Sequence, residues 1–292
     1  MMRWPNLLEA SHAGSPVRTK RYPLVRTGVV SFAAIIITIG ASAERSNAST
    51  AEPATVDTAI VLAVDTSASV GPAQADFQRE GHAAALRSSE VRAAIENGMT
   101  GCIVVTYVEW AGIGELNTVL PWTKLCNASD LDAAADVILR GGDNGFQRKG
   151  RGRTSLSFAI DISAFLLERS LEHARRKVID LSSNGTNNDG SPVAPRRQAA
   201  LEKGYIINAI AIAPSEPGIA DDLPDYYRRE VIGGPGSFVI APHRIEDYAT
   251  ALRRKLVLEI AGLMPHAFGC EAERHSIAVM PLPATADTVC VQ

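Results

Sequence analysis

The sequence lacks most of the short motifs that assign an enzymatic activity. No G-x-S-x-G elbow and no glycine-rich phosphate loop occurs, so serine-hydrolase and nucleotide sites of those types find no support. C-x-x-C is also absent, which argues against a zinc ribbon or a thioredoxin-type redox site, and the six histidines form no H-x-x-x-H pair. The chain contains no internal repeat and no low-complexity segment.

Positive charge is scarce once the first 43 residues are set aside. The whole chain has a formal net charge of −3, but five of its basic residues and one acidic residue lie in 1–43. The remainder carries 24 basic and 31 acidic side chains, a net charge of −7. No basic block interleaved with aromatic residues follows. Nucleic acid is therefore not expected as a partner, because non-specific binding to it depends on Lys and Arg that neutralise phosphates.

Long apolar runs are missing as well. The segment VVSFAAIIITIGASA (29–43) is shorter than the roughly 20 residues that span a bilayer. The basic segment RTKRYPLVRTG precedes it, and the small residues Ala41 and Ala43 lie at its end. This order is typical of a secretory signal peptide, so we expect residues 1–43 to be cleaved after Ala43 rather than to form a membrane anchor. The mature protein is then expected to be periplasmic or secreted, with no membrane span.

Only four cysteines are present, Cys102, Cys126, Cys270 and Cys290. The strand-like segments CIVVTYVEW and LNTVLPWTKLC are predicted to form a hairpin in which Cys102 and Cys126 face each other at the open end. Cys270 and Cys290 would then pair within the tail, as an oxidising compartment allows. Four cysteines permit three pairings, and the sequence does not choose between them; a buried, unpaired Cys102 is the alternative.

Apolar strands and amphipathic helices alternate along the rest of the chain. Residues 44–57 resemble a polar linker, 58–262 a domain and 263–292 a tail that a disulfide could hold. Strands such as TAIVLAVD are too uniformly apolar for a sheet with one wet face, so both faces are expected to be covered. We therefore predict a three-layer, doubly wound α/β fold with a mostly parallel sheet and one antiparallel edge strand.

Several helices are predicted from apolar periodicity and capping signals. They include 72–95, a helix after Ser129 as its N-cap, 154–169 and 245–262. In the last of these, RRK at 253–255 is interpreted as the solvated side of an amphipathic helix.

The polar residues that end the first strand are the main functional signal. Asp65, Ser67 and Ser69 form D-x-S-x-S directly after TAIVLAV, and their alternate spacing allows three oxygens to converge. Ligands of open α/β sheets bind at the carboxyl ends of the strands, and carboxylate and hydroxyl oxygens suit a small hard cation such as Mg²⁺. The alternative is that these residues close a turn and cap the next helix.

D-x-S-x-S after an apolar first strand resembles the metal-ion-dependent adhesion site (MIDAS) of von Willebrand factor A domains, which have a Rossmann-like fold. The resemblance implies a threonine from a second loop and an acid from a third. Thr154 in GRGRTSLSFAI matches the threonine, whereas Asn184 in VIDLSSNGTNNDG stands where the acid is expected. The amide brings no charge, so binding of Mg²⁺, or of Mn²⁺ or Ca²⁺, is expected to be weak or absent. The segment Thr58–Gly262 also resembles an exported bacterial family of uncharacterised domains, DUF1194.

The resulting hypothesis is a non-catalytic, exported binding module that engages an acidic residue of a protein partner through a divalent ion. A metal-free interaction domain of the same fold is the alternative, with Thr154 as a helix N-cap and Asn184-Gly185 as a turn. An aspartic-type hydrolase is less favoured, because AVDTSAS has no second D-[ST]-G loop to supply another carboxylate. Asp180, inside an apolar strand, is expected to be a buried structural acid.

Overall fold

Six strands form one mostly parallel sheet in a computed structural model that describes residues 55–141, 152–212, 222–242 and 244–263. The strand order is β3-β2-β1-β4-β5-β6; β3 pairs antiparallel with β2, and the other neighbours are parallel. The strands are β1 (Thr55–Asp65), β2 (Ile103–Trp110), β3 (Leu116–Leu125), β4 (His173–Ser183), β5 (Ile206–Ala211) and β6 (Val239–Ile240). β1 begins inside the segment 44–57 that was predicted as a linker. The predicted signal peptide 1–43, Cys270 and Cys290 lie outside the described residues.

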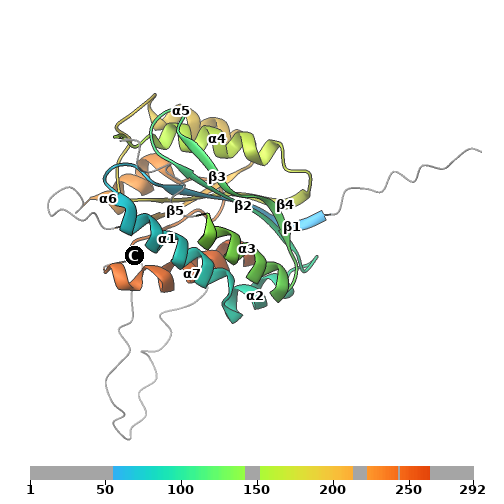
Figure 1. Ribbon diagram of the computed structural model, residues 1–292. Coiled ribbons are helices and arrows are strands. Elements are labelled where there is room, and N and C mark those ends of the chain that lie inside the picture. Colours follow the sequence, from blue (N-terminus) through green and yellow to red (C-terminus); the bar gives the residue numbers. More distant parts are fainter. Residues whose placement is uncertain (1–54, 142–151, 213–221, 243, 264–292) are drawn as a thin grey trace, which may run out of the picture. The chain divides into compact units, whose positions relative to one another are not determined.

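Helices cover both faces of the sheet, with α4 and α5 on one face and α1, α2, α3 and α7 on the other (Figure 1). The α-helices are α1 (Gly71–Leu86), α2 (Ser89–Glu96), α3 (Ala128–Arg140), α4 (Leu156–Glu168), α5 (Val193–Glu202), α6 (Leu223–Tyr226) and α7 (Tyr248–Ala261). A π-helical turn η2 (Tyr227–Val231) follows α6, and a 3₁₀ turn η3 (Ile245–Asp247) precedes α7. The predicted three-layer α/β fold with one antiparallel edge strand is confirmed.

The central strand β1 shows why both faces need a cover. Residues 56–65 are all buried, and alternate side chains enter two separate apolar cores. Val61 belongs to the core that contains Leu156 of α4, and Leu62 belongs to the core that contains Leu252 of α7. A shift of one residue would exchange the two sets of side chains, so the two cores fix the register of β1 and the position of the residue at its end.

Two helix starts differ from the sequence prediction because of capping. The predicted helix 72–95 is two helices, since Ser88 adopts an extended conformation and its side chain accepts a hydrogen bond from Val91 N. α3 begins one residue before Ser129, because Asn127 is the N-cap and accepts a hydrogen bond from the first turn. In both cases the helix starts where a short polar side chain satisfies a free amide.

Lys255 corrects the interpretation of the RRK segment. Arg253 and Arg254 are half-buried, but Lys255 is fully buried against the sheet. Its Nζ lies 2.6 Å from Asp180 Oδ1 of β4 and 2.5 Å from Glu259 Oε1, one turn further along α7. A buried ammonium group requires such partners. Asp180 is therefore the buried structural acid that the sequence predicts, and its partner is a lysine that was assigned to the surface.

The predicted disulfide between Cys102 and Cys126 is confirmed at the open end of the β2–β3 hairpin, across a sequence separation of 24. A cross-link over a loop of this length stabilises a protein by about 3 kcal/mol, in part by restricting the unfolded chain. We expect the double variant Cys102→Ser, Cys126→Ser to lose about 3 kcal/mol in equilibrium urea unfolding. Free thiols at both positions in the wild-type protein, with an unchanged midpoint in the variant, would contradict the pairing.

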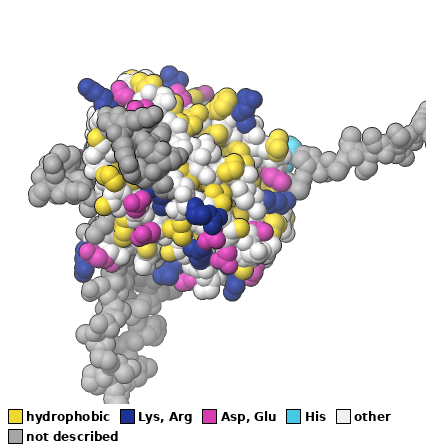
Figure 2. Space-filling view, viewed as in Figure 1, with side chains coloured by type: hydrophobic (Ala, Val, Ile, Leu, Met, Phe, Trp, Pro, Cys, Tyr) yellow, Lys and Arg dark blue, Asp and Glu magenta, His cyan; other side chains and the backbone are white. Residues whose placement is uncertain are grey.

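No helix within the described residues is long and apolar enough to cross a bilayer. On the face drawn in Figure 2, acidic and basic side chains are interspersed with apolar ones, and no broad area of one sign forms in the described part. That face therefore offers no extended basic surface of the kind that neutralises phosphates.

Candidate metal centre

The residues predicted to hold a cation lie at the carboxyl end of the two central strands. β1 and β4 are neighbours, and the chain continues from them in opposite directions, toward β2 and β5. Ligands of open α/β sheets bind at such a switch point, where the two connections diverge. Three loops meet there: 66–70 after β1, 152–155 before α4 and 184–192 after β4.

Hydrogen bonds join the polar side chains of these loops into one chain. Thr154 Oγ1 donates to Ser67 Oγ at 3.1 Å, and the hydroxyl oxygens of Ser67 and Ser69 are 3.2 Å apart. Ser69 Oγ donates to Asn184 Oδ1 at 2.9 Å, across a sequence separation of 115. The structure therefore brings together the four side chains that the sequence predicts from three separate loops.

Asp65, the fifth predicted residue, is fully buried at the end of β1. Its Oδ1 accepts a hydrogen bond from Ser67 N at 2.7 Å, and its Oδ2 accepts one from Ser183 Oγ at 2.6 Å. Burial raises the pKa of Asp65 to about 6, because desolvation of the carboxylate outweighs the hydrogen bonds from Ser183 and Ser67. No Lys, Arg or His of the described residues forms an ion pair with it, so this carboxylate has no positive partner within that part of the chain.

Thr154 is not the N-cap of α4, which was the alternative interpretation of this residue. Ser155 is the N-cap, and its Oγ accepts a hydrogen bond from Phe158 N. Thr154 is 2% exposed, and its hydroxyl lies against Ser67 instead. Two adjacent residues thus perform two tasks: Ser155 caps α4, and the Thr154 hydroxyl joins the polar side chains of the three loops.

The loop after β4 fixes the position of Thr154, a role that the sequence analysis missed. Asn188 Oδ1 accepts a hydrogen bond from Thr154 N at 2.8 Å, and Asn188 N donates to Thr154 O at 2.9 Å. Asn187 Oδ1 accepts a hydrogen bond from Ser157 N in the first turn of α4. In the sequence, the stretch TNNDG could have indicated this role, because short amide side chains readily form hydrogen bonds with nearby backbone groups.

Ser183 and Gln78 support Asp65 and were missed as well. Ser183 Oγ donates to the carboxylate, and Gln78 Nε2 donates to Asp65 O at 3.0 Å. Gln78 Oε1 in turn accepts a hydrogen bond from Ser182 Oγ at 2.7 Å. In the sequence, only their polarity at buried positions could have indicated this role. The two serines of LSS end a strand, and Gln78 lies on the inner side of α1.

Asn184 occupies the expected place of the acid without its charge. It is 3% exposed, its Oδ1 accepts the hydrogen bond from Ser69, and its Nδ2 lies 3.5 Å from Gln74 Oε1. The five predicted side chains together therefore carry one formal negative charge, on Asp65.

Comparison with protein families identifies the group to which this arrangement belongs. Residues 55–264, most of the chain, match the family described as "Protein of unknown function (DUF1194)". The chain belongs to the DUF1194 family. A comparison with curated proteins found no match.

Solved structures similar to this DUF1194 domain include adhesins and a matrix protein. The pilus adhesin SpaC from Lactobacillus rhamnosus GG matches with a TM-score of 0.51 and 15% identity, over 71% of this chain and 31% of SpaC, so this chain spans about a third of that protein. The von Willebrand factor domain of the type V pili tip protein Mfa5 from Porphyromonas gingivalis matches with a TM-score of 0.44 and 10% identity, over 77% of this chain and 99% of that domain. Proximal thread matrix protein 1 from the mussel byssus, solved with a zinc-occupied MIDAS motif, matches with a TM-score of 0.46 and 18% identity, over 72% of this chain and 49% of that one. At these identities the likeness concerns the fold, and the predicted von Willebrand A-like fold of the DUF1194 domain is confirmed.

The donor set of the DUF1194 domain fits a hard divalent cation. One carboxylate, three hydroxyls and one amide oxygen are all oxygen donors, which Mg²⁺, Mn²⁺ and Ca²⁺ prefer. The described residues contain no group of three or more His, Cys, Asp or Glu side chains that could hold a metal ion, so hydroxyl and amide oxygens would have to supply most of the ligands. A cation at this site would also supply the positive partner that the buried Asp65 lacks.

Proposed function

We propose that this domain binds a protein partner through a divalent cation, Mg²⁺ or else Mn²⁺ or Ca²⁺. The proposed ligands, directly or through water, are Asp65, Ser67, Ser69, Thr154 and Asn184. The observation that supports the proposal is the continuous series of oxygen contacts from Thr154 to Asn184, beside a buried carboxylate that has no cationic partner among the described residues.

The charge of the site determines the chemistry of the partner. A single carboxylate neutralises half of the charge of a divalent ion, so a net positive charge of about one remains. Ala68 and Ser69 are exposed, which leaves one side of the site accessible from solvent. An Asp or Glu carboxylate of the partner would complete the coordination and the charge balance. In this proposal the domain is not an enzyme, and it acts after export, in the periplasm or outside the cell.

Thermal unfolding of the full chain tests for the ion. Adding millimolar Mg²⁺ or Mn²⁺ to chelator-treated protein should raise its Tm, because a ligand that binds only the folded state stabilises it by about 1.4 kcal/mol at ten times its Kd. Ser69→Ala should lose most of this shift. Ser89→Ala, which removes an exposed hydroxyl on α2, should keep it. A wild-type Tm that responds to neither chelator nor ion would overturn the proposal.

The alternative is a metal-free interaction domain of the same fold. Capture of the partner with and without chelator, and by Ser69→Ala, distinguishes it from the proposal. The proposal expects a partner captured from envelope extract to dissociate with chelator and to bind Ser69→Ala poorly. A metal-free domain would keep its partner in the presence of chelator. In that case the hydroxyls serve only to connect the three loops.

An aspartic-type hydrolase is less favoured. That chemistry requires two carboxylates that share a proton, whereas the side chain of Asp65 has Ser67 and Ser183 as its hydrogen-bond partners and no carboxylate of the described residues bonded to it. If an unfolded protein substrate is not cleaved at acidic pH in an Asp65-dependent manner, this function is ruled out.

A further inference from the structure

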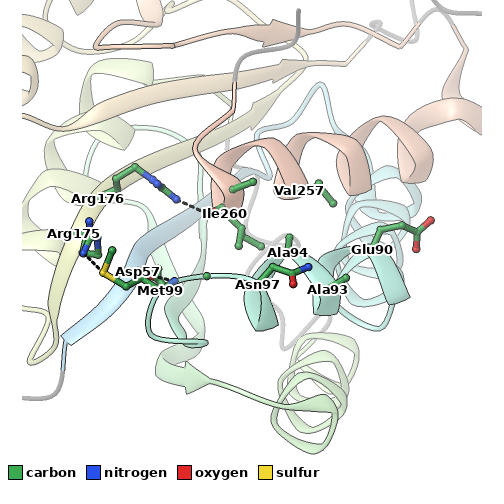
Figure 3. Close-up of a pocket in the computed structure, with 12 residues that line it drawn as sticks. Asp57, Glu90, Ala93, Ala94, Asn97, Met99, Arg175, Arg176, Val257 and Ile260 are labelled. Carbon is green, nitrogen blue, oxygen red and sulfur yellow. Dashed lines mark hydrogen bonds between the residues drawn. The ribbon is translucent and has the colours of Figure 1, made fainter. Parts of the chain in front are cut away.

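A hollow lies at the opposite end of the sheet from the candidate metal centre. It has a volume of about 500 Å³ and is lined by α2, α7, the α2–β2 loop and the first residues of β1 and β4 (Figure 3). Asp57 lines this hollow and Asp65 belongs to the metal centre, so eight residues of one strand, about 26 Å, separate the two sites. The volume is in the range of small-molecule sites.

Two adjacent arginines of β4 give one side of the hollow a positive charge. Arg175 is exposed and Arg176 is half-buried, and neither forms an ion pair with a carboxylate of the described residues. The Nη1 of Arg175 contacts the Sδ of Met99 at 2.6 Å (Figure 3). A thioether is a far weaker acceptor than a carboxylate, so this guanidinium retains most of its capacity to bind an anion.

The two acids that line the hollow already have partners. Asp57 accepts hydrogen bonds from Met99 N at 3.1 Å, Thr100 N at 2.9 Å and Thr100 Oγ1 at 2.8 Å. Burial acts to raise the pKa of Asp57, but these hydrogen bonds outweigh it and hold the pKa below its usual value. Glu90, at the rim, is exposed and lies 3.5 Å from Arg253. The hydrogen bonds do not cancel the negative charge of Asp57, which acts on both Arg175 and Arg176. With Glu90 paired to Arg253, the side chains of Arg175, Arg176 and Asp57 leave the hollow a net charge of about +1.

Arg176 has a buried donor for which the described residues supply no acceptor. Its Nη2 donates to Thr58 Oγ1 and to the carbonyl oxygens of Glu259 and Ile260 at the end of α7. Its Nε is buried and has no hydrogen-bond partner within the described residues. Burial lowers the pKa of Arg176, and the negative charge of Asp57 opposes this only in part. The contact with α7 thus accounts for one guanidinium nitrogen, and the described residues supply no acceptor for the buried Nε.

The other side of the hollow is apolar. Ala94 of α2 and Val257 and Ile260 of α7 line it (Figure 3). Met99 is 75% exposed at its edge, and methionine side chains adapt to ligands of different shape. A ligand that fits this hollow has a charged group at one end and an aliphatic body at the other.

We propose that the hollow binds an aliphatic monocarboxylate, with the carboxylate on Arg175 and Arg176 and the chain along Ala94, Val257 and Ile260. A guanidinium binds a carboxylate through two parallel, charge-assisted hydrogen bonds. Inorganic phosphate would leave the apolar side uncovered, and a neutral alcohol would leave the positive charge uncompensated. A free fatty acid and the C-terminus of a chain that ends in an apolar residue share this chemistry. The site is independent of the metal centre and of the function proposed for it.

Titration calorimetry of the full chain with octanoate tests the proposal. Octanoate should bind about tenfold or more tightly than octanol or inorganic phosphate, because only octanoate uses both sides of the hollow. Acetyl-Ala-Leu with a free carboxylate, compared with its C-terminal amide, distinguishes the two sources. Preference for octanoate indicates a fatty acid, and preference for the peptide acid indicates a chain terminus. Equal binding of octanoate and octanol would overturn the proposal.

Arg175→Gln removes one guanidinium from an exposed side chain, so the variant should fold as the wild type does. Its affinity for octanoate should fall about tenfold. Arg140→Gln makes the same charge change on an exposed residue of α3, away from the hollow, and should bind octanoate as the wild type does. Unchanged octanoate affinity in Arg175→Gln, or an equal loss in Arg140→Gln, would contradict the site.

Discussion

Replacement of Asn184 by Asp should tighten the binding of Mn²⁺ or Mg²⁺ by about tenfold or more, as measured by titration calorimetry. Asn184 Oδ1 already lies 2.9 Å from the Ser69 hydroxyl, so a carboxylate in its place would supply a second negative charge to the same ion. Two unit charges about 4 Å apart interact by roughly 4 kcal/mol near a protein surface, and desolvation offsets only part of this energy. A tenfold gain corresponds to about 1.4 kcal/mol.

The same variant should be less stable than the wild type when no ion is present. In chelator, Asn184→Asp places a second carboxylate near the buried Asp65 without a cation, which costs free energy; added Mn²⁺ should reverse the order of the two Tm values. Asn97→Asp makes the same charge change on an exposed residue at the opposite end of the sheet and should leave the ion affinity and the effect of Mn²⁺ on Tm unchanged. Equal ion affinity in Asn184→Asp and the wild type would favour the metal-free domain.

Lys255→Met should cost about 3–5 kcal/mol of the free energy of unfolding at neutral pH, measured by urea titration with circular dichroism. The ammonium group is fully buried between Asp180 and Glu259, and its removal leaves the buried Asp180 without a cationic partner among the described residues. Methionine keeps much of the volume of the lysine stem, so the loss reports charge more than a cavity. Arg254→Met, on a half-buried residue of the same helix, should cost far less. Similar losses in the two variants would contradict this role of the ion pair.

Stability should also depend on pH through Glu259. Burial and the negative charge of Asp180 raise the pKa of Glu259 to about 8, against the effect of Lys255. The folded state therefore binds this proton more strongly than the unfolded state does. The resulting stability is fully present below the ordinary carboxyl pKa of 4.5 and is lost as the pH rises through about 8. Glu259→Gln, which resembles the protonated form, should flatten the profile in this window; an unchanged slope would assign it to another group.

The fold and the location of the site could be predicted because they follow from backbone geometry. A strand that is apolar at every position, such as TAIVLAV, requires a sheet covered on both faces, and the helices that follow supply the covers. β1 and β4 are neighbouring parallel strands whose ends share one edge, so D-x-S-x-S and Asn184 could be expected to meet. The described element that precedes Thr154 is a helix and not a strand, and the place of Thr154 at this edge was implied by the resemblance to von Willebrand A domains.

The residues that hold the site in place could not be predicted, because each acts through one contact with a residue far away in the sequence. Ser183 lies 118 positions from Asp65, and Asn188 lies 34 from Thr154. Lys255 was misassigned for a related reason. Helical periodicity identifies an apolar stripe, and a charged residue within that stripe is recognised only when its counter-ion on another element is known.

The adjacency of Thr154 and Ser155 has a consequence for the evolution of the domain. Ser155 starts α4, and Thr154 faces the three-loop junction. In the proposed function, a codon change at Thr154 would therefore alter coordination without removing the N-cap of the helix. Lineages could then gain or lose the proposed ion-dependent binding in one step, with no poorly folded intermediate for selection to remove.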